Sequence, residues 1–327
     1  MSTILVTGVG AIMGYGLLKS LRAAAPDAIL VGTDIYADAV GQAWCDHFLQ
    51  APLTAAPEYS AWLLDVIERY QVDLLIPGIE QDVHWLDAHR ALLADSRCRV
   101  VVNDARLIEL TRDKYAMDQA LLAVEDDSRI PSHLTGDFAS LSAELGLPFL
   151  LKPRRSYASK GLVWVREERD FTPWAPLLGE VLMAQPIIGS ANQEYTVAVF
   201  GDGNGNGAAC ASITFQRSLA SDGSTAKAWV RHEPTLDAVV ARLCRHFKPV
   251  GPTNLQFRRA ADGTWKLLEI NPRISSTSSI RTAFGYNEAA MCLAWYLKGE
   301  TPAQPAIRPG FAVRYIEDYV VHDRDHF

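Results

Sequence analysis

The sequence predicts an α/β protein in which a parallel, doubly wound sheet comes first and an α+β part with antiparallel strands follows. Two observations support this prediction. In the first hundred residues, short apolar strands alternate with helical patterns, which is typical of a parallel sheet covered by helices on both faces. Later in the chain, successive strands are joined by glycine-containing turns, which is typical of antiparallel pairs.

Each part has its own order of elements. In the first part we expect strands at Ile4–Thr7, Ile29–Thr33, Leu74–Pro77 and Arg99–Val102, with helices at Tyr15–Ala24, Tyr59–Tyr70 and Gln81–Leu93. The second part begins with a helix from Thr111 to about Ala123, for which Thr111 is the expected N-cap. Strands are then expected at Phe149–Lys152, Leu162–Val165, Tyr195–Phe200, Ala208–Phe215, Ala226–Val230, Thr253–Arg259 and Trp265–Asn271, and helices at Leu236–Phe247 and Asn287–Leu297.

Composition and charge exclude several classes of protein. The net charge is −7 and no run of Lys or Arg stands out, so nucleic acid is not an expected partner. Apolar runs are far shorter than the roughly 20 residues of a membrane span, and the N-terminus leads directly into a strand without a signal peptide. The five cysteines form no CxxC pair and are interpreted as thiols of a reduced, cytoplasmic protein.

A glycine-rich turn, Gly8-Val-Gly-Ala-Ile-Met-Gly14, links the first strand to the first helix, and Asp34 ends the second strand. This arrangement is typical of dinucleotide-binding proteins, because the helix N-terminus faces an anion and the acid holds a ribose. An NAD(P)-dependent oxidoreductase is therefore one hypothesis. The other is that the turn only packs helix against strand or binds another anion, since such turns are a weak signal.

The strongest pattern lies on two later strands. Residues two apart on a strand point to one face, so Glu269, Asn271 and Arg273 project together, and Gln256 can lie beside Glu269 if the strands form a hairpin. Carboxylate and amide oxygens suit Mg²⁺, and a guanidinium group suits a transferring phosphoryl group. The alternative is a solvated strand face with a surface ion pair.

Two lysines extend this pattern. Lys152 ends an apolar strand, where an ammonium group needs an anionic partner, and Lys114 lies in the first turn of its helix. The loop from Arg154 to Gly161 follows Lys152 and is rich in hydroxyl groups, cations and backbone donors, as a mobile cover for phosphates would be.

Taken in order, these motifs resemble the ATP-grasp superfamily, and most closely the branch related to the carbamoyl phosphate synthetase large subunit. The resemblance rests on Lys114, Lys152 with its loop, the runs Met183–Gly189 and Gln193–Val197, Gln256, and the block Glu269-Ile-Asn-Pro-Arg273. It covers essentially the whole chain. It implies a Rossmann-like pre-ATP-grasp domain at residues 1–108, a small lid subdomain at 109–184, and a C-terminal subdomain with the metal site at 185–327.

The resemblance also implies roles for individual residues. Lys114 and Lys152 would hold the ATP phosphates, and Ser159 and Gly161 would belong to the lid. Gln185, Pro186, Ile187 and Ile188 would form the hinge against the adenine, and Glu194 would hold the ribose. Gln256, Glu269 and Asn271 would bind two Mg²⁺ ions, with Mn²⁺ as an alternative. Arg273, Lys152 and Arg217 would be the catalytic cations.

The implied reaction is ATP-dependent ligation, in which a carboxylate is phosphorylated to an acyl phosphate and joined to an amine, with release of ADP and phosphate. Substrate contacts are expected from Ser275, Ser276 and Arg281, and from Glu80 and Asp34, each of which could equally be a helix cap. A homodimer is allowed by this interpretation. The competing hypotheses are the oxidoreductase and a non-catalytic nucleotide-binding regulator, against which the complete metal set argues.

Overall fold

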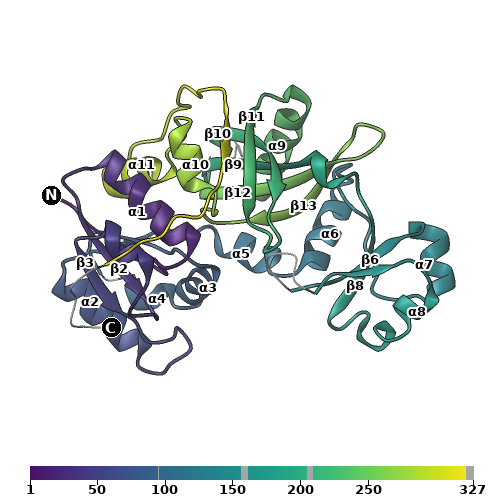
Figure 1. The fold of residues 1–327 in the computed structure, drawn as a ribbon, viewed down its shortest axis with the longest axis horizontal. Coiled ribbons are helices and arrows are strands. Elements are labelled where there is room, and N and C mark those ends of the chain that lie inside the picture. Colours follow the sequence, from purple (N-terminus) through teal and green to yellow (C-terminus); the bar gives the residue numbers. More distant parts are fainter. Residues whose placement is uncertain (95, 156–160, 205–208, 322–327) are drawn as a thin grey trace.

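The N-terminal unit is a five-stranded parallel sheet with the order β3-β2-β1-β4-β5 (Figure 1). The computed structural model describes residues 1–94, 96–155, 161–204 and 209–321. The strands of this sheet are β1 (Thr3–Thr7), β2 (Ile29–Asp34), β3 (His47–Gln50), β4 (Leu74–Ile76) and β5 (Arg99–Val100). The connecting helices are α1 (Ile12–Ala24), η1 (Val40–Trp44), α2 (Tyr59–Arg69), α3 (Glu80–Ala88) and α4 (Arg90–Leu93).

The predicted parallel sheet is thus confirmed, with two differences in detail. β3 was not expected from the sequence; it is short and only half-buried, so its apolar pattern is weak. The expected helix Gln81–Leu93 is divided into α3 and α4 at His89. The sheet is apolar on both faces because α1 buries Leu17 and Leu21 against one face while α2 buries Leu63 against the other.

Two short helices, α5 (Ala105–Thr111) and α6 (Lys114–Ala123), lead out of this sheet. The expected N-cap at Thr111 is wrong. Thr111 is the last residue of α5, and its hydroxyl donates to Leu107 O at 2.9 Å. Asp113 caps α6 instead, because its Oδ1 accepts from the backbone N–H of Tyr115 at 2.9 Å. Lys114 therefore occupies the first position of α6.

A small three-stranded sheet, which we call the lid sheet, has the order β7-β6-β8. Its strands are β6 (Phe149–Pro153), β7 (Val163–Val165) and β8 (Leu182–Pro186), and α7 (Phe138–Leu145), α8 (Glu168–Phe171) and η2 (Ala175–Leu177) accompany them. Phe149, Leu151 and Phe171 form its own apolar core. Ser159 lies outside the described residues.

The large sheet has the order β13-β12-β9-β10-β11-β14 and is antiparallel throughout. Its strands are β9 (Glu194–Asp202), β10 (Ala209–Leu219), β11 (Thr225–Arg231), β12 (Val250–Arg259), β13 (Trp265–Asn271) and β14 (Phe311–Val313), with η3 (Ala191–Gln193) ahead of β9. Helix α9 (Pro234–Phe247) covers one face through Leu236, Val240 and Leu243. The α+β second part is therefore as predicted.

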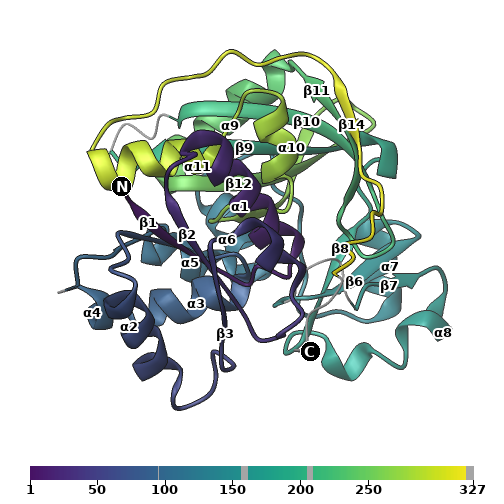
Figure 2. The same cartoon turned by 60° about the vertical axis from the view of Figure 1, so that its left-hand side comes forward.

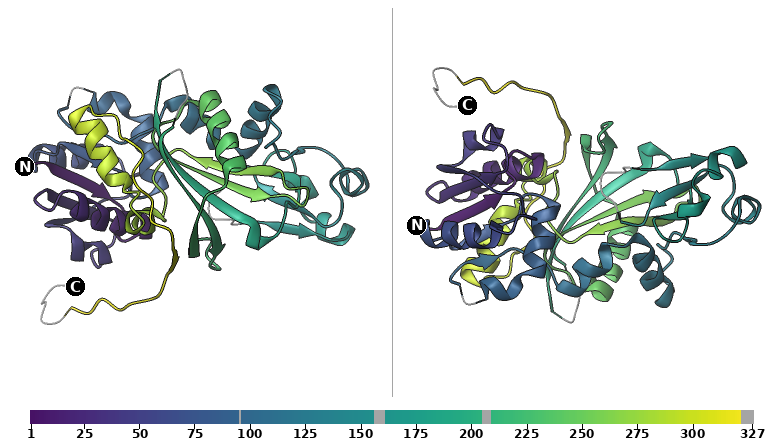
Figure 3. Two further views of the ribbon diagram at one scale, coloured as in Figure 1. Left: turned by 90° about the horizontal axis from the view of Figure 1, so that it is seen from above. Right: turned by 90° about the horizontal axis from the view of Figure 1, so that it is seen from below.

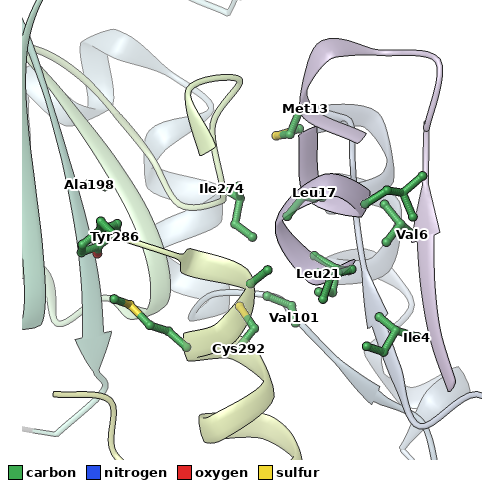
Figure 4. Close-up of a cluster of buried hydrophobic side chains, with 14 of the residues drawn as sticks. Ile4, Val6, Met13, Leu17, Leu21, Val101, Ala198, Ile274, Tyr286 and Cys292 are labelled. Atoms are coloured by element: carbon green, nitrogen blue, oxygen red, sulfur yellow. The ribbon is translucent and has the colours of Figure 1, made fainter. Parts of the chain in front are cut away.

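The last helices join the large sheet to the N-terminal unit. They are α10 (Ser278–Ala283), α11 (Glu288–Cys292) and η4 (Leu293–Lys298). Figure 4 shows Tyr286 and Cys292 on one side of this contact and Leu17 and Leu21 of α1 on the other. One apolar core therefore spans both parts. The division of the chain at residues 108 and 184 stays a prediction. None of the described helices is both long and apolar enough to cross a membrane.

Candidate functional site

A pocket lies where α6, the lid sheet and β13 meet. Four predicted site residues line it, and each comes from a different element: Lys114 from α6, Lys152 from β6, Gln185 from β8 and Glu269 from β13. Residues that the sequence did not single out complete the lining; they are Thr111, Met117, Asp118, Leu121, Ile130, Leu267, Leu268 and Ile270. The wall of the pocket is thus mostly apolar, and its charged residues are Lys114, Asp118, Lys152 and Glu269.

Lys152 is the pocket residue whose charged form is most disfavoured by its surroundings. Burial lowers the pKa of its ammonium group to about 8, and the charge of Lys114 lowers it further. Glu269 and Asp118 act in the opposite direction but do not restore the ordinary value. A lysine in this environment gains from an anionic ligand, because such a ligand would stabilise its charged form.

The predicted row of oxygen donors on the large sheet is formed. Gln256 and Glu269 are directly paired across β12 and β13. Asn271 Nδ2 donates to Glu269 Oε1 at 3.0 Å, and Arg273 Nη2 donates to Asn271 Oδ1 at 3.1 Å. The expected hairpin therefore places all four side chains on one face, with Glu269 as the carboxylate among them.

An arginine cluster that the sequence only partly predicted adjoins this row. Buried Glu194 is held on both oxygens, by Arg217 Nη2 at 2.8 Å and by Arg258 Nη2 at 2.9 Å. Arg217 Nη2 also donates to Gln256 Oε1 at 2.6 Å. Arg258 was missed, although it lies two residues after Gln256 and so shares its face. The ribose-binding role of Glu194 stays a prediction, and its carboxylate here orders two cations.

Arg273 is tied to the N-terminal unit. Its Nη2 donates to Glu80 Oε2 at 2.6 Å, across 193 residues of sequence. Burial opposes the charge of Glu80, but contacts with His84 and Arg273 outweigh it and lower the pKa of Glu80 to about 2. The sequence offered a substrate contact or a helix cap for Glu80. In the structure it is an ion-pair partner that orients Arg273.

The other predicted substrate contacts need correction. Arg281 is fully buried and ion-paired with Glu288 at 3.2 Å, so it is not available to a substrate. The Ser275 hydroxyl is buried and bonded to Thr277 Oγ1 at 2.6 Å. Asp34 Oδ2 accepts from Gly10 N at 2.7 Å, so it closes the glycine turn instead of facing a ligand. Ser276 is half-buried, and its role as a substrate contact stays a prediction.

The hinge and lid residues are placed as follows. Gln185 is buried, and its Nε2 donates to Ser132 Oγ at 2.6 Å, which fixes β8 against the preceding segment. Pro186, Ile187 and Ile188 follow it as a half-buried run. Gly161 has a φ of +78°, a conformation that favours glycine, at the far end of the lid loop.

The base of the lid loop is attached to α6. Arg154 Nη2 donates to Asp113 Oδ2 at 2.6 Å, and the backbone N–H of Lys114 donates to Arg154 O at 3.0 Å. Asp113 therefore caps the helix that carries Lys114 and also anchors the strand end that carries Lys152. No pattern in the sequence predicts this contact, apart from the charges of the two residues.

Comparisons with known proteins agree with this architecture. Residues 180–319 match the family model described as ATP-grasp in the biosynthetic pathway with Ter operon, and no curated protein matches the chain. The chain is similar to N5-carboxyaminoimidazole synthetase from Staphylococcus aureus complexed with ADP, at 17% identity over 94% of this chain and 80% of that one, with a TM-score of 0.69. It is also similar to carboxyaminoimidazole ribonucleotide synthase from Aspergillus clavatus complexed with ATP, at 16% identity over 94% and 80%, with a TM-score of 0.71.

A third similar structure is the biotin carboxylase domain dimer of 2-oxoglutarate carboxylase from Hydrogenobacter thermophilus, in complex with MgADP, ADP and bicarbonate. It is 16% identical over 95% of this chain and 73% of that one, with a TM-score of 0.68. Identities this low establish the fold, while the family model reaches the strands that carry the oxygen donors. Residues 180–319 thus match an ATP-grasp family model, and the chain as a whole shares the fold of these solved structures.

Proposed function

We propose that the chain is an ADP-forming ligase that phosphorylates a carboxylate with ATP and passes the acyl group to an amine. The observation that supports this most is the meeting of Lys114, Lys152 and Glu269 in one pocket. Two cations in a mostly apolar pocket suit a nucleotide, whose base is apolar and whose phosphates are anionic. The similar structures that hold ADP, ATP and MgADP support the same assignment.

The residues present fit a magnesium ion that enters with ATP. Mg²⁺ usually binds proteins through one or two carboxylates and takes its other oxygens from water and phosphate, and the row offers one carboxylate and two amide oxygens. Glu269, Gln256 and Asn271 would hold the ion, and the count of two ions remains part of the proposal. When bound, the metal would neutralise charge on the transferred phosphoryl group.

The side chains of this pocket and row divide the work of the first step. A carboxylate oxygen of the substrate attacks the γ-phosphorus of ATP, and the bond from that phosphorus to the bridging oxygen of ADP breaks. Lys152 and Lys114 offset the negative charge that shifts toward ADP. Arg273 and Arg217 lie beside the oxygen donors and stabilise the acyl phosphate that forms. Glu80 keeps Arg273 oriented throughout.

In the second step an amine attacks the carbonyl carbon, the bond to phosphate breaks, and the amine loses a proton to give the amide. The acyl phosphate reacts with water, so the lid must close before it forms. We propose small molecules for both the acid and the amine, a cytoplasmic location, and a homodimer; the related biotin carboxylase domain is itself described as a dimer.

A two-part experiment tests this function. An ADP-release screen with Mg-ATP, over amino acids and small carboxylates, should find at least one acid and amine pair that raises the rate, with the amide identified by mass spectrometry. Mg-ATP at 100 times its Kd should stabilise the protein by about 2.7 kcal/mol and raise Tm by a few degrees, whereas NADH should leave Tm unchanged. Stabilisation by NADH alone would instead support the oxidoreductase.

A further inference from the structure

The chain returns to the large sheet near its end. β14 pairs with β11, with Val313 opposite Lys227, and the backbone N–H of Arg314 donates to Ala226 O at 2.8 Å. Further on, the ring of Tyr319 lies 6.3 Å from that of Trp44 in the N-terminal unit. We call residues 311–319 the C-terminal strap. Figures 2 and 3 show it leaving the edge of the large sheet and running back past the N-terminal sheet.

The strap places the guanidinium group of Arg314 beside the candidate site. Its Nη1 donates to Thr225 O at 3.2 Å, and its Nη2 donates to Ser276 O. Thr225 also contacts Arg217 through its hydroxyl, at 3.5 Å, and Ser276 follows Arg273 by three residues. Arg314 is therefore linked to Arg217 through Thr225, and it contacts the segment that follows Arg273 in the chain.

Arg314 differs from the other arginines around this site in having no carboxylate partner. Each of the others has an ion-pair partner: Arg217 and Arg258 share Glu194, Arg273 pairs with Glu80, and Arg281 pairs with Glu288. Among residues 1–94, 96–155, 161–204 and 209–321, no acid forms an ion pair with Arg314. Its side chain is half-buried, and burial lowers the pKa of its guanidinium group despite the opposing charge of Asp222.

A half-buried cation that donates only to carbonyl oxygens has lost part of its hydration without gaining an ion-pair partner. An anion would supply the missing negative charge. The guanidinium group of Arg314 has five N–H donors, of which two bond to carbonyl oxygens, so the remaining N–H groups can bind an anion. The reactive carboxylate of the substrate is needed at Arg217 and Arg273, so the anion at Arg314 must be another one.

We infer that Arg314 binds a second anionic group, a carboxylate or a phosphate, of the acid whose reactive carboxylate is phosphorylated. This inference rests on the proposed function. It makes the enzyme selective for acids with two anionic groups. The C-terminal strap is then the specificity element of the site, because β14 and the contact of Tyr319 with Trp44 fix the backbone on either side of Arg314.

Matched pairs of acids test this selectivity in the full-length protein. Each pair differs in one anionic group: succinate and succinamate, glutamate and glutamine, 3-phosphoglycerate and glycerate. We expect wild-type ADP release to favour the doubly charged member of at least one pair. Arg314→Met should lower kcat/KM for that acid by about 10- to 100-fold, the usual effect of losing a charged hydrogen bond. The pair whose preference is lost in Arg314→Met shows whether the second anionic group is a carboxylate or a phosphate.

Three controls separate binding from folding. Arg314→Lys should recover part of the preference, and exposed Arg308, which precedes the C-terminal strap, should tolerate Arg308→Met. Calorimetric Kd for MgADP and the rate with the singly charged acid should not change in Arg314→Met, whereas a structural role would alter both. A preference that survives in Arg314→Met, or a wild type that favours no doubly charged acid, overturns the inference.

Failure of the proposed function can be recognised separately. If no acid releases ADP from the wild type, the ligase assignment fails, and calorimetry with succinate and 3-phosphoglycerate then decides on Arg314. Binding that is lost in Arg314→Met and kept in Arg308→Met would retain the anion site. Absent or unchanged binding would remove it.

Discussion

The glycine turn of the N-terminal sheet and the pocket beside the lid sheet both have residues suited to phosphate, but they differ in what already fills them. In the turn, Asp34 accepts from Gly10 N at 2.7 Å. A Cβ on Gly14 would come within 2.2 Å of Gly8 O, so α1 packs directly against the backbone of the turn. In the pocket, by contrast, Lys152 and Lys114 repel each other at the end of an open cavity.

This difference shows why the glycine turn, although the more familiar motif, is the weaker indicator of a nucleotide site. Glycines that permit close packing and glycines that bind a phosphate produce the same sequence pattern, and only the structure distinguishes the two cases. Functional pockets, in turn, keep like charges together at a cost in stability, which a ligand then relieves. The oxidoreductase hypothesis is disfavoured because Asp34, its ribose-binding acid, is engaged by the turn.

The largest effect should come from removing the carboxylate of the oxygen-donor row. We expect Glu269→Ala to lower the rate of substrate-dependent ADP release by about 1,000-fold, because the amide oxygens of Gln256 and Asn271 cannot supply the lost charge. A coupled ADP assay measures it. Asp34→Ala, in the glycine turn, should stay within about twofold of wild type. If Glu269→Ala keeps its activity, the ligase mechanism is wrong.

A smaller effect, on affinity, should follow the protonation of Lys152. The pKa of this group is about 8 in the free protein, and an anionic nucleotide raises it by favouring the charged form. MgADP should therefore bind equally well at pH 6.5 and pH 7, and about tenfold more weakly at pH 9 than at pH 7, because binding then requires uptake of a proton. Isothermal titration calorimetry gives both the Kd and the proton uptake.

Two variants identify the lysine responsible. Lys152→Met should bind MgADP weakly and without this pH dependence, whereas Lys266→Met should retain the wild-type profile, because half-buried Lys266 donates to Asp127 O and does not line the pocket. A profile that is the same in Lys152→Met and wild type would assign the titration to another group. No comparable dependence is expected from the glycine turn, which contributes backbone N–H groups that do not titrate.

The sequence predicted those features of the site that depend on local pattern. Alternation along β13 placed Glu269 and Asn271 on one face, and the hairpin turn brought Gln256 beside Glu269. Arg273 follows the end of the strand and donates to Asn271 Oδ1. These relations follow from the period of a strand, which needs no knowledge of the rest of the molecule.

What the sequence missed depends on distant partners. Strand alternation does not say what packs over a face, so the burial of Arg281 against Glu288 and the pairing of Arg273 with Glu80 were not foreseen. The same holds for Asp118, which reaches the pocket only because α6 packs against β13. Long-range ion pairs carry no periodic signal in one sequence.

The smallest effect should separate structure from function in the glycine turn itself. Asp34→Ala leaves the backbone N–H groups of Gly10 and Tyr36 without their acceptor, because Asp34 oxygens bond them at 2.7 and 3.1 Å. We expect the free energy of unfolding in urea to fall by about 1–3 kcal/mol, with no change in the Kd for MgADP. Asp34→Asn, which retains one acceptor oxygen, should lose less. A variant that keeps its stability but binds NADH or MgADP several-fold more weakly would mean that the turn, and not only the pocket, holds the nucleotide.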